Sequence, residues 1–378
     1  MRKVAEKCYL PANRTLLNLI RKHGDDFKVS FSISGTALEQ FQRYAPDVLE
    51  SFAELVQTGR VELLAETYAH SLSALKSRAE FERQIRMHDR RMKALFGYTP
   101  RVFRNTELIY ADKIGRWISD MGYKAVLTEG ADHILGWRSP NYLYKASADN
   151  DLNMLLKNYR LSDDIAFRFS QRDWAGWPLT TDKFVTWLQA IPAEEQIVNL
   201  FMDYETFGEH QWHSTGIFQF LEHLPDAVFG NSGFRFVTPS EAISELTPAA
   251  ELSMPYAVSW ADEERDLSAW LGNPIQDDAF NSLYKLEQRV NACNDPVLHR
   301  DWLLLQTSDH FYYMCTKYFA DGDVHKYFNP YESPYEAFIN FMNVLSDFEL
   351  RLDAMPVMEK AAIPAPTGLN GKNQLAAI

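Results

Sequence analysis

The sequence predicts an α/β protein with a parallel sheet or barrel, followed by a helical part. Short apolar runs alternate with amphipathic helical stretches from residue 27 to about residue 246, which is the pattern of β/α units. After about residue 250, long helical patterns follow one another without strand-like runs between them. Acidic residues come directly after two apolar runs, at Glu107 and Asp203. Such sheets carry their chemistry at the carboxyl ends of the strands, so both residues are candidates for a functional site.

The first third of the chain predicts helices before and between short strands. Residues 1–22 are expected to form two amphipathic helices separated by Pro11, because proline interrupts a helix interior. Residues 37–58 predict a helix with a kink or break at Pro46 and an end at Gly59. Strands are expected at 27–33, 61–66, 101–106 and 125–128, and further helices at 78–96 and 111–121.

The second part begins with a connection rich in Trp and Tyr at 137–180, which is too long for an ordinary loop. We expect it to be functional or to carry short elements. The elements expected beyond it are helices at 181–191, 214–223, 239–246, 276–293, 296–320 and 333–353, and strands at 197–203 and 234–237. We therefore divide the chain into an α/β part at 1–250, a helical part at 251–355 and a flexible tail at 356–378.

Composition narrows the possible partners and the compartment. The net charge of −13 argues against nucleic acid or an anionic membrane as the main partner, and no apolar run approaches the ~20 residues that span a bilayer. Cys8, Cys293 and Cys315 are too widely spaced for a disulfide framework, and no signal peptide is recognisable, so we expect a cytoplasmic protein. The aromatic share of 13% suits a carbohydrate binder as well as an aromatic core. The sequence does not indicate an oligomeric state.

The two strand-end carboxylates indicate a chemistry. A lone Asp after a strand is commonly a helix cap, but residues 203–210 hold three acids, a Tyr, a Phe, a Gly and a His. A second apolar run leads into Glu107. A pair of carboxyl groups, one ionised and one protonated, is what cleavage of a glycosidic bond requires.

Five segments resemble the α-amylase group of glycoside hydrolase family 57. They are GRVEL at 59–63, FRNTELIY at 103–110, MDYETFGEH at 202–210, WAD at 260–262 and LLLQTSDH at 303–310. The resemblance extends over about residues 1–353, and the segments around Glu107 and Asp203 are the most specific. It implies an incomplete (β/α)7 barrel followed by a helical domain, retaining action on α-glucans and no cofactor. It also implies Glu107 as the nucleophile and Asp203 as the general acid/base. We expect both carboxyls to face one cleft, ~5–5.5 Å apart.

Further residues of these segments are expected to bind the substrate. They are His70, His210, Trp260, Asp262 and Asp309. A structural histidine is the alternative for His70, which could otherwise bond a sugar hydroxyl. His210 could orient a carboxylate, while Trp260 could stack on a sugar and Asp262 bind its hydroxyls. The alternative for Asp309 is a capping or helix-dipole role. Trp137, Trp174 and Trp177 are expected either to line a glucan groove or to pack in the core.

One feature of the family pattern is lacking. Members carry a first barrel strand that ends in His-Gln-Pro and gives a histidine to the site, and no such segment occurs here. We therefore expect a barrel without its first strand, which leaves one edge of strand 27–33 unpaired.

Four functions remain open. The first is α-glucan hydrolysis, the second is 4-α-glucanotransferase activity, and the third is glucan binding without cleavage by an inactive fragment. The fourth is a zinc hydrolase, since His210 and His213 lie near Asp203 and Glu209. That set lacks a third histidine nearby, so we expect no metal.

Overall fold

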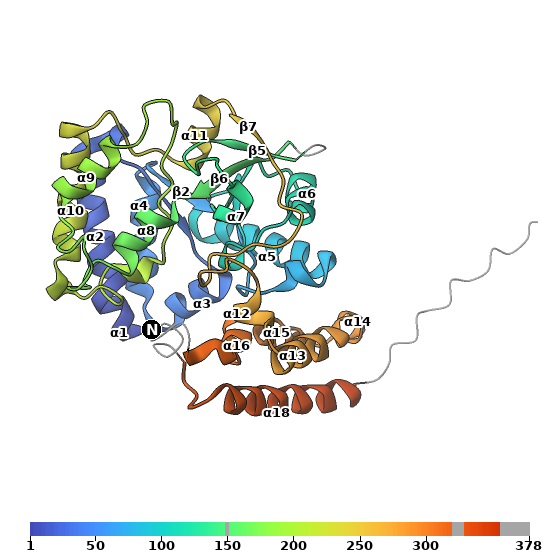
Figure 1. The fold of residues 1–378 in the computed structure, drawn as a ribbon. Coiled ribbons are helices and arrows are strands. Elements are labelled where there is room, and N and C mark those ends of the chain that lie inside the picture. Colours follow the sequence, from blue (N-terminus) through green and yellow to red (C-terminus); the bar gives the residue numbers. More distant parts are fainter. Residues whose placement is uncertain (148–150, 320–328, 356–378) are drawn as a thin grey trace, which may run out of the picture.

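The computed structural model describes residues 1–147, 151–319 and 329–355, and two sheets form its centre (Figure 1). Strands β1 (Val29–Ser32) and β2 (Val61–Leu64) pair in parallel. A five-stranded sheet has the order β3-β4-β6-β5-β7. Its strands are β3 (Val102–Arg104), β4 (Ala125–Glu129), β5 (Tyr144–Ala146), β6 (Asn153–Lys157) and β7 (Ala250–Leu252). Because β5 runs antiparallel to β6, this sheet is mixed, and the predicted α/β class is confirmed.

A single bridge joins the two sheets. Ala65 donates its N–H to the carbonyl of Val102 at 2.9 Å and accepts from the N–H of Arg104 at 2.8 Å. Strands β1, β2, β3, β4 and β6 therefore lie side by side, and neighbours among them run parallel. Every residue of β2 and β4 is buried, as expected for parallel strands that are covered on both faces. The carboxyl ends of these strands consequently meet on one side of the molecule.

Helices connect the parallel strands much as predicted. They are α2 (Leu10–His23), α3 (Gly35–Tyr44), α4 (Pro46–Gln57), α5 (Arg78–Phe96), α6 (Asp112–Asp120), α7 (Asp132–Leu135) and α8 (Tyr159–Ala166). The expected break at Pro46 is confirmed, since α3 ends before it and α4 begins at it. The positive φ of Gly59, 69°, lets the chain turn from α4 into β2.

The expectation of two helices separated by Pro11 is wrong. Helix α1 (Arg2–Val4) continues into a π-helical turn, Ala5–Tyr9, and then directly into α2. Pro11 lies in the first turn of α2, where a residue needs no N–H for a hydrogen bond within that helix. The wider π turn before it leaves room for the proline ring, which would clash with the preceding turn of a regular helix.

Two expected strands, 197–203 and 234–237, are not strands. Their backbones make isolated bonds instead of ladders. The N–H of Asn158 donates to the carbonyl of Asn199 at 2.9 Å, and the N–H of Phe236 donates to that of Asp26 at 3.1 Å. An apolar run becomes a strand only where a neighbouring strand offers a row of backbone hydrogen-bond partners in matching register. These two segments border a large cavity instead.

The connection 137–180 carries the short elements β5, β6 and α8 in addition to loops. After it come α9 (Thr181–Gln189), α10 (Ile217–Asn231) and α11 (Pro239–Glu245). Helix α10 is longer than expected and continues through Pro225. Helix α11 begins with a capping box, in which Thr238 and Glu241 bond each other's backbone N–H groups.

The helices after residue 267 lie together on one side of the sheet-bearing part (Figure 1). They are α12 (Ser268–Leu271), α13 (Pro274–Lys285), α14 (Glu287–Ala292), α15 (Pro296–Leu305), α16 (Ser308–Tyr312) and α18 (Pro334–Asp353). Their buried side chains share one core with the sheet, which includes Phe103, Val126, Trp302 and Phe348. In the described part, no helix is long and apolar enough to cross a membrane. The expected tail 356–378 lies outside the described residues.

Candidate active site

A cavity of ≈ 2100 Å³ opens where the parallel strands end. Its wall includes all seven candidate residues: His70, Glu107, Asp203, His210, Trp260, Asp262 and Asp309. Strand β1, which among the described residues pairs only with β2, forms another part of the wall. Ordinary small-molecule pockets measure ~300–1,000 Å³. The space therefore suits a long ligand better than a small one.

Glu107 is the most tightly held carboxylate of the cavity. Its Oε2 accepts from the indole N–H of Trp260 at 2.8 Å, while Oε1 lies 3.2 Å from His70 Nε2 and accepts from Ser308 Oγ at 3.2 Å. Burial by itself would raise the pKa of Glu107, but the bond and charge of His70, the charge of Arg104 and the bond from Trp260 lower it to about 2. Glu107 is thus ionised at neutral pH, as a nucleophile must be.

His70 bridges Glu107 to a second carboxylate, Glu66. Its Nδ1 lies 3.2 Å from Glu66 Oε2, and buried Glu66 also accepts from Ser32 Oγ at 2.7 Å. Burial would lower the pKa of His70, but bonds to the two carboxylates and their charges raise it to about 10. Glu66 was not among the residues predicted for the site. The available signal was its position, because Glu66 follows β2 closely, as Glu107 follows β3.

Trp260 contacts Glu107 in a way that the sequence did not indicate. Besides the indole bond, its backbone N–H donates to the carbonyl of Glu107 at 3.2 Å. Its ring is also approached by two cations, with the Arg104 guanidinium 4.8 Å and the Lys157 ammonium 5.3 Å from the ring centre. Cations at this distance from an aromatic ring are attracted to it. Trp260 is therefore a hydrogen-bond donor to Glu107 and also carries cation–π contacts.

Asp203 stands at the start of a 3-10 turn, Tyr204–Thr206, and is exposed at the cavity wall. The two acids that follow it have other partners: the hydroxyl of Tyr9 donates to Glu205, and Glu209 lies 3.8 Å from the ammonium of Lys7. Burial raises the pKa of Glu205, and so does the charge of Asp203. The N-terminal helix thus anchors this loop, while Asp203 faces the cavity.

Asp309 links the two proposed catalytic carboxylates electrostatically. It lies in the first turn of α16, where it is exposed to the cavity. Surrounding protein raises its pKa to about 6, His70 opposes the rise, and the charges of Glu107 and Asp203 add to it. Coulomb energies fall with distance, so both charges act on one region of the cavity. The N-cap residue of α16 is Thr307, and the first-turn position of Asp309 also suits the alternative helix-dipole role.

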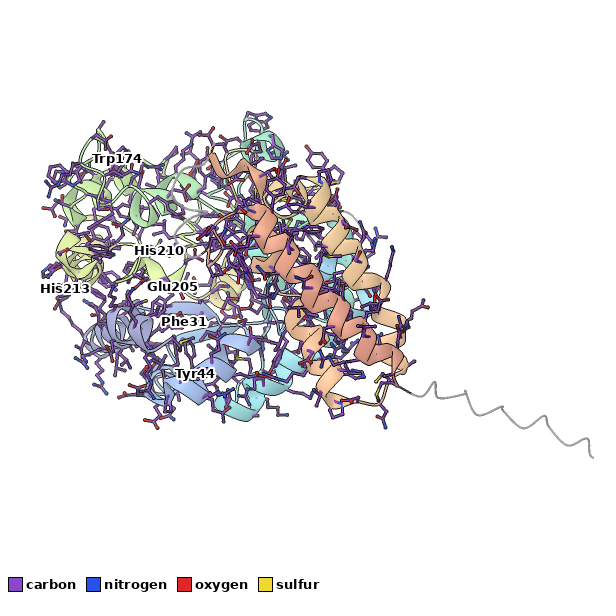
Figure 2. The ribbon with its side chains drawn as sticks, turned by 90° about the horizontal axis from the view of Figure 1, so that it is seen from below. Phe31, Tyr44, Trp174, Glu205, His210 and His213 are labelled. Carbon is purple, nitrogen blue, oxygen red and sulfur yellow. The ribbon has the colours of Figure 1, made fainter. Side chains whose placement is uncertain are left out.

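The remaining two candidates line the cavity from different loops. The carboxylate of Asp262 lies 3.9 Å from the ammonium of Lys317. The backbone N–H of His210 donates to the carbonyl of Glu205 at 2.9 Å. Figure 2 shows His210 and Glu205 on the side of the site where Phe31 of β1 lies. The ring centre of Tyr204 is 5.1 Å from that of Phe31. The loop that carries Asp203 therefore packs against β1.

Backbone strain is concentrated in the segments that build this site. The non-glycine residues with positive φ in the described part are His70 (50°), Glu107 (57°), Leu108 (52°), Asp262 (56°) and Arg265 (53°). Such conformations cost of order 1–3 kcal/mol each and persist only where the surroundings fix them. All five residues line the cavity.

Two of the alternatives, a zinc site and a glucan groove lined by tryptophans, find less support. Within the described residues, no group of three or more His, Cys, Asp or Glu side chains is arranged to hold a metal ion. His213 lies well apart from His210 and packs against Phe218 (Figure 2). Trp137 and Trp177 are exposed at 95% and 42%, and among the described residues that line the cavity neither they nor Trp174 occurs. A glucan groove lined by these tryptophans is therefore not part of this cavity.

Known proteins are similar to this chain in sequence and in fold. Residues 1–255 match the family model described as glycosyl hydrolase family 57. A protein of Methanocaldococcus jannaschii, named as a candidate alpha-amylase, is 45% identical over 358 residues, which are 92% of this chain and 75% of that protein. A 4-alpha-glucanotransferase of Thermococcus litoralis is 20% identical over 273 residues, which are 70% of this chain and 40% of that protein.

Solved structures agree at the level of the fold. A branching enzyme of the same family from Pyrococcus horikoshii superposes with a TM-score of 0.66 at 16% identity, over 93% of this chain and 89% of that one. The Thermococcus litoralis 4-alpha-glucanotransferase superposes with a TM-score of 0.63 at 18% identity, over 82% of this chain and 52% of that one. The family model and the 45% identical relative identify a glycoside hydrolase. The chain belongs to glycosyl hydrolase family 57, which confirms the predicted family resemblance.

Proposed function

We propose that the protein cleaves α-glucans with retention of configuration, with Glu107 as the nucleophile and Asp203 as the general acid/base. The observation that carries this proposal is the environment of Glu107. Its carboxylate is held by His70, Trp260 and Ser308, and its pKa is lowered to about 2, in a cavity that Asp203 also lines. The relatives named for alpha-amylase or glucanotransferase activity support α-glucan as the substrate.

The reaction would proceed in two displacements. A Glu107 oxygen attacks the anomeric carbon while the bond from that carbon to the leaving oxygen breaks and Asp203 gives its proton to that oxygen. Asp203, now a carboxylate, takes a proton from water, which attacks the same carbon and releases Glu107. Proton transfer of this kind contributes roughly 10²–10⁴-fold in rate. His70, Trp260 and Ser308 restrain Glu107, so that less reorientation is needed before the attack.

We also propose the architecture in which this site is assembled. Strands β1, β2, β3, β4 and β6 would belong to an incomplete (β/α)7 barrel within residues 1–250. Residues 251–355 would form a helical domain that completes the site. The order of the parallel strands supports the first part. The second is supported by Ser308, which lies in α16 and bonds Glu107.

A second candidate function is transfer of the cleaved glucan to another sugar chain. Transfer differs from hydrolysis only in the acceptor that attacks the glycosyl-enzyme. The size of the cavity favours it, because ≈ 2100 Å³ leaves room for an acceptor chain beside the donor. A third candidate, glucan binding without cleavage, requires no particular role of Glu107.

Product analysis separates these functions. The purified chain is incubated with a maltooligosaccharide and with soluble starch, and the products are resolved by chromatography beside a Glu107→Ala control. Shorter sugars that are lost in the control would support hydrolysis, and additional longer sugars would support transfer. Binding to starch without any products, from a folded chain, would contradict both catalytic functions.

A further inference from the structure

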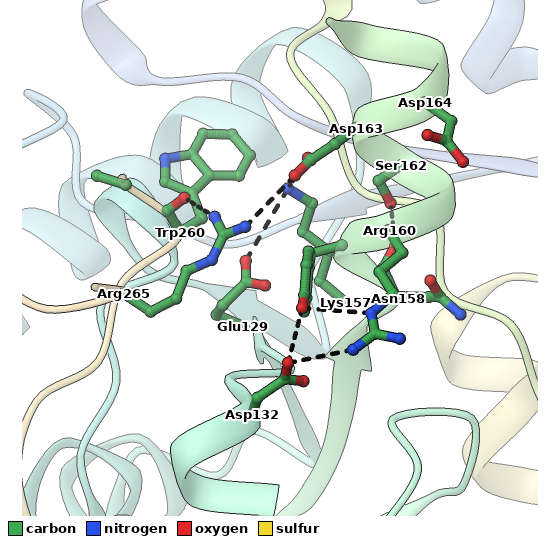
Figure 3. Close-up of polar contacts among 12 residues, drawn as sticks. Glu129, Asp132, Lys157, Asn158, Arg160, Ser162, Asp163, Asp164, Trp260 and Arg265 are labelled. Carbon is green, nitrogen blue, oxygen red and sulfur yellow. Dashed lines mark hydrogen bonds and ion pairs between the residues drawn. The ribbon is translucent and has the colours of Figure 1, made fainter. Parts of the chain in front are cut away.

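Trp260 is held against Glu107 by buried and half-buried charged side chains that the proposed reaction does not itself use. They are Glu129 at the end of β4, Lys157 at the end of β6, Asp163 in α8 and Arg265 in the loop after Trp260 (Figure 3). Glu129 is fully buried and Lys157 is 3% exposed. Ion pairs at such depth need close compensation, because each lone charge would be costly there.

The contacts of these side chains converge on Trp260. The ammonium of Lys157 lies 3.0 Å from Asp163 and 3.9 Å from Glu129. Arg265 lies 3.3 Å from the other oxygen of Asp163 and donates to the carbonyl of Trp260. The Lys157 ammonium is also 5.3 Å from the centre of the Trp260 ring. The ring and the backbone of Trp260 are thus both fixed by one group of charges (Figure 3).

The loop that carries Trp260 needs this support. Its ends are tied by a bond from the N–H of Ser259 to the carbonyl of Arg265 at 3.1 Å. Between them, Asp262 has a φ of 56°, and Arg265 itself has a φ of 53°. Because such backbone relaxes unless its surroundings fix it, the pairing of Arg265 with Asp163 is needed to keep Trp260 in place.

We propose that Lys157 is a positioning residue, which holds Trp260 in the place from which its indole N–H orients the Glu107 carboxylate. The proposal rests on the role proposed for Glu107 above. Lys157 acts through Trp260, since its ammonium faces Asp163, Glu129 and the indole ring. If Trp260 shifts, Glu107 loses its bond of 2.8 Å, and the carboxylate form becomes less favoured.

The first variant is Lys157→Met, which keeps the length of the side chain and removes its charge. Glu129→Gln is combined with it, so that Glu129 does not remain as a second unpaired carboxylate. We expect kcat to fall by about tenfold or more, with KM changed by less than about twofold, because only the orientation of Glu107 suffers. The acid limb of the pH profile of kcat/KM should move to higher pH. His70, Glu66, Arg104, Asp203 and Asp309, the charged groups around Glu107, stay unchanged.

A double-mutant cycle with Trp260→Phe tests whether Lys157 affects Glu107 through Trp260. Trp260→Phe removes the indole N–H, so it should give the same shift of the acid limb. Adding Lys157→Met to Trp260→Phe should then shift the limb little further, because residues that act in series are not additive. Lys22→Met is the control: it removes an ammonium that pairs with Asp226 of α10, neither residue lines the cavity, and it should leave the acid limb in place.

Two results would overturn the proposal: fully additive effects of the two substitutions, or an unmoved acid limb in a folded Lys157→Met chain. A wild-type chain without activity would instead refute the proposed function. Lys157 can then be tested without substrate. The difference in unfolding free energy between Glu107 and Glu107→Gln chains titrates with Glu107, and its midpoint should rise in the Lys157→Met background. An unchanged midpoint would refute the positioning role.

Discussion

The Nε2 atom of His70 lies 3.2 Å from Oε1 of Glu107, while the other ring nitrogen lies 3.2 Å from Glu66. One imidazolium therefore serves two carboxylates. The lowered pKa of Glu107 and the raised pKa of His70 have the same origin, since each stabilises the charged form of the other. The arrangement keeps the proposed nucleophile ionised.

This pairing predicts a window of pH in which the site stabilises the fold. The pKa of Glu107 is lowered from 4.5 to about 2, so its contribution is present above about pH 4.5 and is lost as the pH falls towards 2. The pKa of His70 is raised from 6.5 to about 10, so its contribution is present below pH 6.5 and is lost as the pH rises towards 10. The site should stabilise most between about pH 4.5 and 6.5.

Urea unfolding of wild type and Glu107→Gln measures this window. We expect a difference of about 3 kcal/mol near pH 5.5 that shrinks as the pH falls below about 4.5 and as it rises above about 6.5. His133→Gln is the control, because His133 is an exposed histidine whose ring stacks on Tyr256. A difference between wild type and Glu107→Gln that does not vary with pH would contradict the pairing.

The hydrogen bonds to Glu107 should differ in their effect on catalysis. Trp260→Phe removes a bond of 2.8 Å to Oε2, and Ser308→Ala removes a longer one, 3.2 Å, to Oε1. Bonds to charged groups contribute roughly 1.5–3 kcal/mol, so Trp260→Phe should lower kcat by about 10- to 100-fold, and Ser308→Ala by less. Steady-state kinetics on a maltooligosaccharide checks the order. A larger loss in Ser308→Ala would refute this view of the site.

The identity of the general acid can be tested with a leaving group that needs no proton. Asp203→Asn should cleave a maltooligosaccharide at least about 100-fold more slowly, yet release fluoride from a glycosyl fluoride in the first displacement at a rate close to that of the wild type. Only the second displacement, in which Asp203 acts as a base, should stay slow with the fluoride. Asp309→Asn should slow both substrates alike if Asp309 binds sugar. Asp309 is a fair competitor, because its pKa is raised to about 6. The opposite pattern in the two variants would assign proton transfer to Asp309.

A buried hydrogen-bond network should couple the helical part to the sheet-bearing part. The side chain of Gln306 donates to Glu80 at 3.0 Å and accepts from Gln84 at 3.0 Å and Tyr284 at 3.1 Å. Gln306→Leu removes all three bonds, while Glu80 and Gln84 keep the bond of 2.8 Å between them, so we expect a loss of about 1–3 kcal/mol of stability. Denaturant unfolding measures it, with Gln171→Leu in a surface loop as the control. An unchanged midpoint would show that the network is dispensable.

Much of the fold was predictable because its signals are local. Strand β3 and the Glu107 turn follow from one apolar run and the polar residues after it, and α4 begins at Pro46 as its sequence predicts. Segment 197–203 has an equally good apolar run, yet it forms no ladder. Whether a run becomes a strand depends on its neighbours in space, which a local pattern does not contain.

The site was predictable in its residues and not in their contacts. Glu107 and Trp260 are 153 positions apart in the chain, so no spacing rule could indicate the bond between them. Lys157 was missed because β6 lies in a stretch without clear periodicity. Glu66 was part of a predicted strand, but only the fold shows that His70 joins it to Glu107.

The left-handed backbone of His70, Glu107, Leu108, Asp262 and Arg265 has a consequence for protein engineering. Glycine adopts this conformation without steric cost, so glycine at Asp262 or Arg265 would remove local strain while it deletes a side chain of the site. A heat-tolerance screen that does not also demand turnover would therefore be drawn towards the active centre. Selection for thermal stability would favour glycine at these few positions, whereas selection for product formation would favour the present side chains.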